Sequence, residues 1–204
     1  MKLKIDLLLI FIVALLTLFF TNYKIMAKQH YKTDAVMFGD SLTANGKWNK
    51  LFPGIKIVNL GRGGDSTHDM LLRINYVYKY HPKYCFVMAG FNDLDTHRNQ
   101  HQILNDYSSI IENLQQNNIT PIIMSTLYAR DYFDENQHIN NKIELLNNAL
   151  KDYADSNKIT FIDLNQYLSE NHCLLPNFAA DHVHINDKAY EIWKENIKNI
   201  IYKN

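Results

Sequence analysis

A serine, an aspartate and a histidine stand at positions from which they could carry out acyl transfer. Ser41 follows an apolar run in the stretch VMFGDSLT, residues 36–43, where a tight turn can present its hydroxyl as a nucleophile. His184 is the candidate base, and Asp181, three residues earlier on the same predicted loop, can bind its other ring nitrogen and select its tautomer. This combination predicts hydrolysis of an ester or thioester through an acyl-enzyme.

Two further stretches could stabilise the oxyanion that develops in such a reaction. The stretch NLGRGGDST, residues 59–67, is rich in glycine, which allows sharp turns and leaves backbone N–H groups unobstructed. Asn92 follows another apolar run and can add a side-chain amide. We therefore predict an oxyanion hole formed by the N–H groups of Ser41 and Gly64 and by the Asn92 side chain.

Each of these residues also has a structural alternative. A Gly-Asp-Ser sequence after a strand is often only a turn or a helix cap, and an Asp-His pair can be a loop salt bridge. The catalytic interpretation is favoured because four groups of residues occur in order along the chain, each after a predicted strand. The groups contain Ser41, Gly64, Asn92, and the pair Asp181 and His184. We expect His182 to be an exposed neighbour of the base, and Asp40 and Asp93 to accept backbone N–H groups in their turns.

After residue 33, predicted strands and helices alternate along the chain, and they position these side chains. Five apolar runs are mostly continuous in hydrophobicity, as in parallel strands covered on both faces. The predicted strands are Ala35–Phe38, Ile55–Leu60, Tyr84–Ala89, Thr120–Ser125 and Thr160–Leu164. Amphipathic segments between them predict helices, the last of them capped by Asn186. This order predicts an α/β fold in which ligands bind beyond the carboxyl ends of the strands.

The four groups together resemble the signature blocks of the SGNH hydrolases, also called the GDSL lipases and esterases. The resemblance covers residues 34 to about 200, and NLGRGGDST is similar to the second block of the branch that contains platelet-activating-factor-acetylhydrolase-like and lysophospholipase- or thioesterase-like enzymes. It implies a flavodoxin-like three-layer α/β/α sandwich with a five-stranded parallel sheet, and ester hydrolysis without a metal or other cofactor. The functional residues of the family carry over to Ser41, Gly64, Asn92, Asp181 and His184.

The chain departs from the family pattern at two positions. Phe91 stands where a small or hydroxylated residue is common, and Ile185 follows the histidine where proline is frequent. Neither change removes a catalytic atom, but Phe91 affects the expected size of the substrate pocket.

Aromatic and aliphatic residues near the predicted active edge could bind an acyl chain. The candidates are Phe91, Tyr128, Tyr132, Phe133, Leu175 and Phe178. The alternative is that these side chains close the core over the sheet. We expect a lipid or an acylated envelope molecule as substrate, with an O-acetyl ester of a cell-envelope glycan as the nearest alternative. A third possibility, from another class, is an envelope binding protein that has lost hydrolysis.

The first 27 residues are typical of an export signal. Lys2 and Lys4 precede the apolar run Leu7–Phe20, which is interrupted only by Thr17. Because the run is shorter than the roughly 20 residues of a membrane span, and the cleavage site before residue 28 is weak, both a cleaved signal and an anchor formed by residues 5–23 stay open. We expect residues 28–204 to form one hydrolase domain at the periplasmic or extracellular face, where the N-terminal segment could associate with the membrane.

Composition narrows the remaining classes. The 204 residues are 47% hydrophobic, which suits one globular domain, and 21 basic residues balance 21 acidic ones without a dense basic block, which argues against a nucleic-acid partner. The histidines show no metal-binding spacing, so we expect no metal site. Cys85 lies in an apolar run and is expected to be a buried thiol, although a bridge to Cys173 stays open.

Overall fold

The structure is a computed structural model, in which the contacts divide the chain into two units, Met1–Tyr31 and Lys32–Asn204. The structure describes Thr17, residues 32–130 and residues 139–202. The predicted export signal, apart from Thr17, lies outside these residues, and so do Tyr132 and Phe133 of the predicted acyl-binding set. Within the described ranges, no helix has the length and apolar character needed to cross a bilayer.

A five-stranded parallel sheet forms the centre of the second unit, with the order β2-β1-β3-β4-β5. The strands are β1 (Thr33–Gly39), β2 (Ile57–Gly61), β3 (Pro82–Met88), β4 (Thr120–Met124) and β5 (Thr160–Ile162). All five predicted strands are confirmed, with ends shifted by a few residues. Successive side chains point to opposite faces, so that Val36 and Val87 join one core cluster while Met37 and Phe86 join the other. The continuous apolar runs follow from this burial on both faces.

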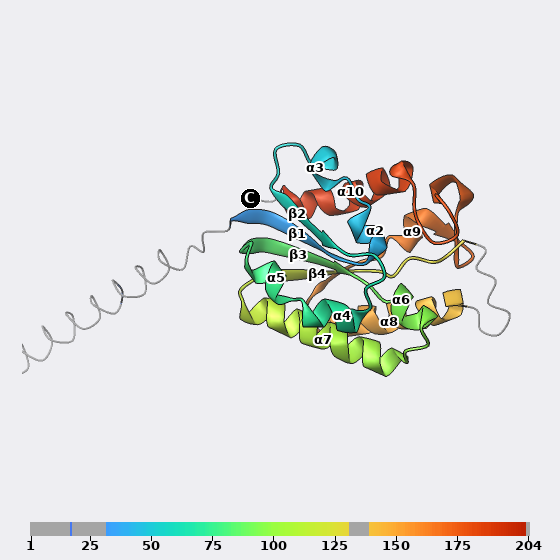
Figure 1. Cartoon of the computed structure of the whole chain (residues 1–204), viewed down its shortest axis with the longest axis horizontal. Coiled ribbons are helices and arrows are strands. Elements are labelled where there is room, and N and C mark those ends of the chain that lie inside the picture. The colour runs from blue at the N-terminus through green and yellow to red at the C-terminus, as the bar shows by residue number, and fades with distance from the viewer. Residues whose placement is uncertain (1–16, 18–31, 131–138, 203–204) are drawn as a thin grey trace, which may run out of the picture. The chain divides into compact units, whose positions relative to one another are not determined.

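Helices cover both faces of the sheet and complete the predicted three-layer α/β/α sandwich (Figure 1). One layer contains α2 (Ser41–Ala44), α3 (Trp48–Leu51), α9 (Asn165–Leu168) and α10 (Asp187–Ile201). The other contains α4 (Thr67–Leu72), α5 (Asn75–Tyr78), α6 (Phe91–Asp95), α7 (Gln100–Gln116) and α8 (Ile139–Asn157). Between α9 and α10 the chain forms a short antiparallel pair, β6 (Ser169–Glu170) and β7 (Cys173–Leu174), and a 3-10 helix, Pro176–Phe178.

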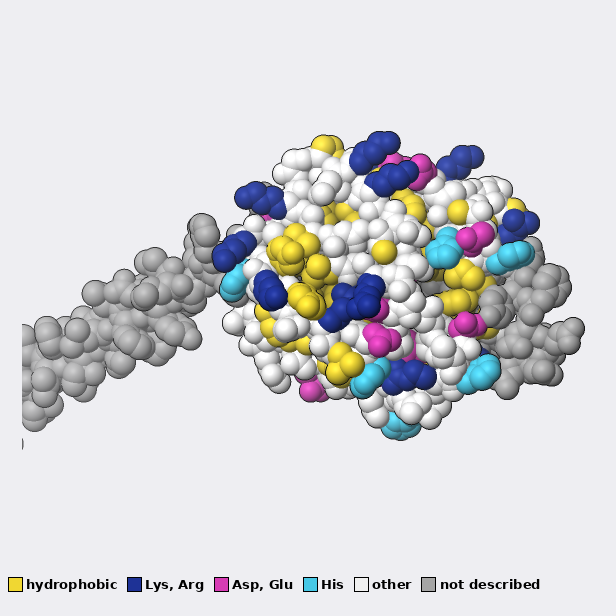
Figure 2. Space-filling model, in the orientation of Figure 1, with side chains coloured by type: hydrophobic (Ala, Val, Ile, Leu, Met, Phe, Trp, Pro, Cys, Tyr) yellow, Lys and Arg dark blue, Asp and Glu magenta, His cyan; other side chains and the backbone are white. Residues whose placement is uncertain are grey.

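Side-chain caps and buried stripes explain why the longer helices form. Asn186 caps α10 as predicted, because its side chain accepts hydrogen bonds from the N–H groups of Lys188 and Ala189. The same helix buries Trp193 and Ile197 against the sheet. Basic and acidic side chains are interspersed over the described face drawn in Figure 2, in keeping with the balanced charge of the sequence.

The register of the three central strands creates the edge on which the predicted site lies. Gly39 at the end of β1 is level with Gly61 of β2 and with Met88 of β3. The order of the strands reverses between β1 and β3, which is where α/β sheets of this type bind ligands. The segments that follow β1, β2 and β3 therefore start from neighbouring points on one edge.

The two cysteines are separate free thiols. Cys85 is fully buried in β3, as expected, and burial raises the pKa of its thiol. Cys173 is half-buried in β7. The structure therefore does not contain the bridge that the sequence left open.

Candidate active site

Ser41 is the first residue of α2, directly after the turn that ends β1. Asp40 caps this helix, because its Oδ1 atom accepts a hydrogen bond of 3.0 Å from the Leu42 N–H, which is the role predicted for it. Burial raises the pKa of Asp40 to about 7, although the Leu42 N–H and the nearby His184 both act to lower it. The turn thus presents a half-buried serine beside a fully buried carboxyl group.

His184 bridges Ser41 and Asp181. Its Nε2 atom lies 3.0 Å from the Ser41 hydroxyl oxygen, and its Nδ1 atom lies 2.8 Å from Asp181 Oδ2. A carboxylate only accepts hydrogen bonds, so Nδ1 carries the proton and Nε2 is left as the acceptor for the serine hydroxyl. The structure therefore brings the three predicted residues into the arrangement required for general-base activation of a serine.

The loop around Asp181 holds this carboxylate in place. The backbone N–H groups of His184 and Val183 donate to Asp181 Oδ1 at 2.7 and 2.8 Å, and these two bonds contribute most to lowering the pKa of Asp181 to about 2. The Ala180 N–H donates to the His184 carbonyl at 2.8 Å, which closes the loop on itself. Asp181 is therefore ionised at neutral pH, and the 54% exposure of its side chain also favours the charged form.

The glycine-rich loop after β2 passes beside the nucleophile. A Cβ atom at Gly63 would lie 3.9 Å from the Cβ of Ser41, which is ordinary van der Waals contact. Gly64 has a φ of +82°, a left-handed conformation that favours glycine. The loop thus places its backbone next to Ser41.

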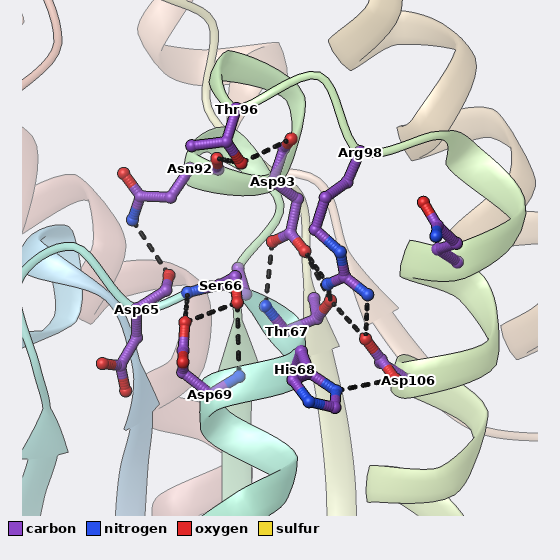
Figure 3. Close-up of polar contacts among 12 residues, drawn as sticks. Asp65, Ser66, Thr67, His68, Asp69, Asn92, Asp93, Thr96, Arg98 and Asp106 are labelled. Carbon is purple, nitrogen blue, oxygen red and sulfur yellow. Dashed lines mark hydrogen bonds and ion pairs between the residues drawn. The ribbon is translucent and has the colours of Figure 1, made fainter.

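Asn92 is the second residue of α6 and faces this loop. Its Nδ2 atom donates a hydrogen bond of 2.9 Å to the backbone carbonyl of Asp65, the residue after Gly64. An amide nitrogen carries two hydrogens, so one stays available for a substrate oxygen. Figure 3 shows this contact between the start of α6 and the loop.

The predicted acyl-binding residues have different environments. Phe91 and Tyr128 are 7% and 9% exposed and belong to one core cluster, which favours the core alternative for both. Leu175 and Phe178 are half-buried, and Phe178 packs against the other cluster. His182 is exposed, as expected, with its Nδ1 atom 3.3 Å from the Arg130 carbonyl oxygen.

A buried ionic cluster behind the site was not predicted. The sequence suggested that Asp93 would serve its own turn, but its carboxylate accepts hydrogen bonds from Thr67 in the neighbouring loop segment. Arg98 forms ion pairs with both Asp93 and Asp106. No sequence pattern marked this cluster, because the burial of Asp93 and its pairing with Arg98 depend on the tertiary structure.

Arg73 is a second unpredicted contributor. It forms an ion pair with Asp65, and its guanidinium donates to the carbonyl oxygens of Leu60 and Gly39 at 2.8 and 3.1 Å. These contacts fasten the ends of β1 and β2 to the loop that contains Gly64. No sequence pattern marks them, because Arg73 stands at the end of an amphipathic segment like many surface arginines.

Comparison with known proteins agrees with this geometry. Residues 37–192 match the model of the GDSL-like lipase/acylhydrolase family. A GDSL-like lipase from Bacteroides thetaiotaomicron is similar in structure, with 26% identity, a TM-score of 0.78 and coverage of 90% of this chain and 96% of that one. An acylhydrolase from Bacteroides fragilis is similar with 25% identity, a TM-score of 0.77 and coverage of 85% and 88%.

A curated relative shares only part of its length with this chain. The N-acylneuraminate cytidylyltransferase of Streptococcus agalactiae serotype III is 26% identical over 134 residues, which are 66% of this chain. The match spans about a third, 32%, of that protein. The family match over most of the chain and the two structures confirm the resemblance read from the motifs: the chain belongs to the GDSL-like lipase/acylhydrolase family.

Proposed function

We propose that this protein is an esterase in which Ser41 is the nucleophile and His184 and Asp181 activate it. The observation that carries the proposal is the chain of two hydrogen bonds, 3.0 Å from Ser41 to His184 and 2.8 Å from His184 to Asp181. The serine oxygen attacks the ester carbonyl while its proton passes to His184 Nε2. That proton then passes to the leaving alcohol, and water activated by His184 cleaves the acyl-enzyme.

The oxyanion of each tetrahedral intermediate would be bound by the Ser41 and Gly64 N–H groups and the Asn92 amide. The contact of the glycine loop with Ser41 and the Asn92 bond to that loop support this assignment. Donors held in advance around developing charge are usually a large part of catalysis in acyl transfer.

The substrate that we propose is an acylated lipid or an acylated glycan of the cell envelope. The support is the export signal predicted from Lys2, Lys4 and the apolar run Leu7–Phe20, which would place residues 28–204 at the periplasmic or extracellular face, with or without a membrane anchor.

A short acyl group, as in an O-acetylated glycan, is the second candidate. It is favoured by the core positions of Phe91 and Tyr128, which remove two of the six apolar side chains expected to bind a long chain. The curated relatives are named for an acylated sugar, N-acylneuraminate, which adds support for a glycan although the match covers only a third of them.

Hydrolysis of p-nitrophenyl esters from acetate to palmitate by the full chain tests the proposal. The Ser41→Ala variant should lose turnover, while Ser108→Ala, which removes a surface hydroxyl on α7, should keep it. A preference for acetate would select the short-acyl candidate, and a preference for long chains would select a lipid. Equal turnover by wild type and Ser41→Ala would overturn the nucleophile assignment, and no turnover on any ester would favour the binding-protein alternative.

A further inference from the structure

Asp93 connects the start of α6 to the glycine-rich loop. It follows Asn92 directly and is completely buried. Its Oδ2 atom accepts the Thr67 N–H at 2.9 Å, and its Oδ1 atom accepts the Thr67 hydroxyl at 2.7 Å. Figure 3 shows both bonds crossing from the helix to the loop segment. One carboxylate therefore holds one residue of the neighbouring segment through two separate donors.

These bonds act beside the contact that Asn92 makes itself. Thr67 begins α4 and ends the loop that contains Gly64, while Asn92 donates to Asp65 in the same loop at 2.9 Å. The two links join segments that are 26 and 27 residues apart in the chain. Together they fasten the start of α6 to Asp65, the residue after Gly64, and to Thr67 at the end of the loop.

The charge of Asp93 is compensated behind the site. Arg98 pairs with Asp93 and Asp106, and it also donates to the Thr67 hydroxyl at 3.0 Å. A buried carboxylate without such a partner would be strongly destabilising. Asp93 therefore holds Thr67 through two hydrogen bonds while Arg98 pairs with the same carboxylate.

We infer that Asp93 is a positioning residue of the oxyanion hole, which it serves by holding the Asn92 helix and the Gly64 loop in register. The inference rests on the proposed function, because it assumes that Asn92 and Gly64 bind the oxyanion. Asp93 itself touches no reacting atom. Its loss should affect the transition state more than substrate binding, because the donors meet their full charge only there.

The Asp93→Asn variant of the full chain tests this inference with matched variants. Asparagine keeps the size of the side chain but replaces one acceptor oxygen by a donor, so it cannot hold both Thr67 groups and Arg98. We expect kcat for p-nitrophenyl acetate to fall by roughly 10- to 100-fold, with KM changed less than about threefold, as for a displacement of about an ångström in a catalytic group.

Asp69→Asn is the matched control. Asp69 lies in the same α4 segment, and its carboxylate accepts from the Ser66 N–H at 3.0 Å and from the Ser66 hydroxyl. These bonds are local to the loop and do not cross to α6. Asp69→Asn should therefore lower thermal stability without the loss in kcat expected for Asp93→Asn.

A double-mutant cycle with Asn92→Ala separates positioning from general stability. If Asp93 acts through the Asn92 amide, the loss caused by Asp93→Asn becomes smaller once that amide is absent. Multiplicative losses, or a folded Asp93→Asn protein with unchanged kcat, would overturn the inference while leaving Ser41 as the nucleophile.

Thr67→Val provides a second measurement if Asp93→Asn does not fold. It removes the hydroxyl bond to Asp93 together with the contacts of that hydroxyl with Arg98 and Asp106, but keeps the Thr67 N–H bond to Asp93. It should lower kcat about three- to tenfold in the same direction, as a smaller displacement would. An unchanged kcat in folded Thr67→Val would count against the inference. Ester turnover that survives Ser41→Ala would instead overturn the proposed function, and this inference with it.

Discussion

The Ser41 hydroxyl oxygen and the His184 Nε2 atom lie 3.0 Å apart, although 143 residues separate them in the chain. Parallel strands bring the turn after β1 to the edge of the sheet, and α10 packs on the layer that contains α2. A hydrogen bond of 2.6 Å from the Tyr190 hydroxyl to the Leu42 carbonyl joins these two helices next to the serine. The contact between Ser41 and His184 thus depends on how α10 docks beside α2 and the end of β1.

Replacing Asn92 by alanine should reduce kcat by roughly 100- to 1000-fold, because the side chain is one of three predicted donors to the oxyanion. Steady-state kinetics on p-nitrophenyl acetate measures the loss. Asn99→Ala serves as a control, since Asn99 caps α7 and is expected to affect stability alone. A kcat close to that of the wild type would remove Asn92 from the oxyanion hole.

Asp181→Asn should separate the fold of the loop from the orientation of the base. The asparagine oxygen can still accept from the N–H groups of Val183 and His184, but its NH₂ group would face His184 Nδ1 and favour the wrong tautomer. We expect kcat to fall by roughly 100- to 10,000-fold in a protein that stays folded but loses the stability contributed by the ionised carboxylate. Asp187→Asn, which breaks an exposed ion pair with Lys47, should retain activity.

The same ionisation sets the low-pH behaviour of Asp181. Its pKa is lowered to about 2, so its contribution to stability is present above the ordinary value near 4 and is lost as pH falls toward 2.

The comparison of kcat between the two variants decides the role of Asp181. If Asp181→Asn loses no more activity than Asp187→Asn, orientation of His184 by Asp181 is not required.

Asp40→Asn should make the stability of the protein less dependent on pH between 3.8 and about 7. Burial raises the pKa of Asp40 from 3.8 to about 7, so between these pH values the unfolded chain releases a proton that the folded protein keeps. Stability therefore falls as pH rises through this window, and the penalty is absent below pH 3.8. Asparagine can still cap α2 without this penalty.

Urea unfolding at pH 5 and pH 8 measures the difference for Asp40. The wild type should lose about 3 kcal/mol more than Asp40→Asn between these two pH values, at 1.36 kcal/mol for each unit of pKa shift. Parallel stability curves for the two proteins would show that the Asp40 carboxyl does not keep its proton in the folded state.

Gly39→Ala should destabilise the protein by about 1–3 kcal/mol, because a Cβ atom there would overlap the Met88 carbonyl oxygen and the Thr43 hydroxyl. Gly63→Ala is the control, since its Cβ would make only ordinary contact with Ser41 and should change the free energy of unfolding by less than about 1 kcal/mol. Thermal unfolding compares them, and equal melting temperatures would show that the turn after β1 yields easily.

Local patterns in the sequence were enough to predict most of the fold. The strands were recognised because burial on both faces requires continuous apolar runs, and Asn186 was recognised because helix capping depends on neighbouring residues. The environments of Phe91 and Tyr128 could not be decided in this way, since a core aromatic and a pocket aromatic have the same local pattern.

The sequence by itself determined the family, the α/β order and the identity of the residues proposed to act, because these depend on residue types and on their order along the chain. Only the tertiary structure decided that Asp93 serves the loop of Thr67 rather than its own turn, and that Arg73 and Arg98 neutralise the carboxylates behind the site. Such contacts join side chains from separate segments, and their partners depend on strand register and helix docking, which no local pattern specifies.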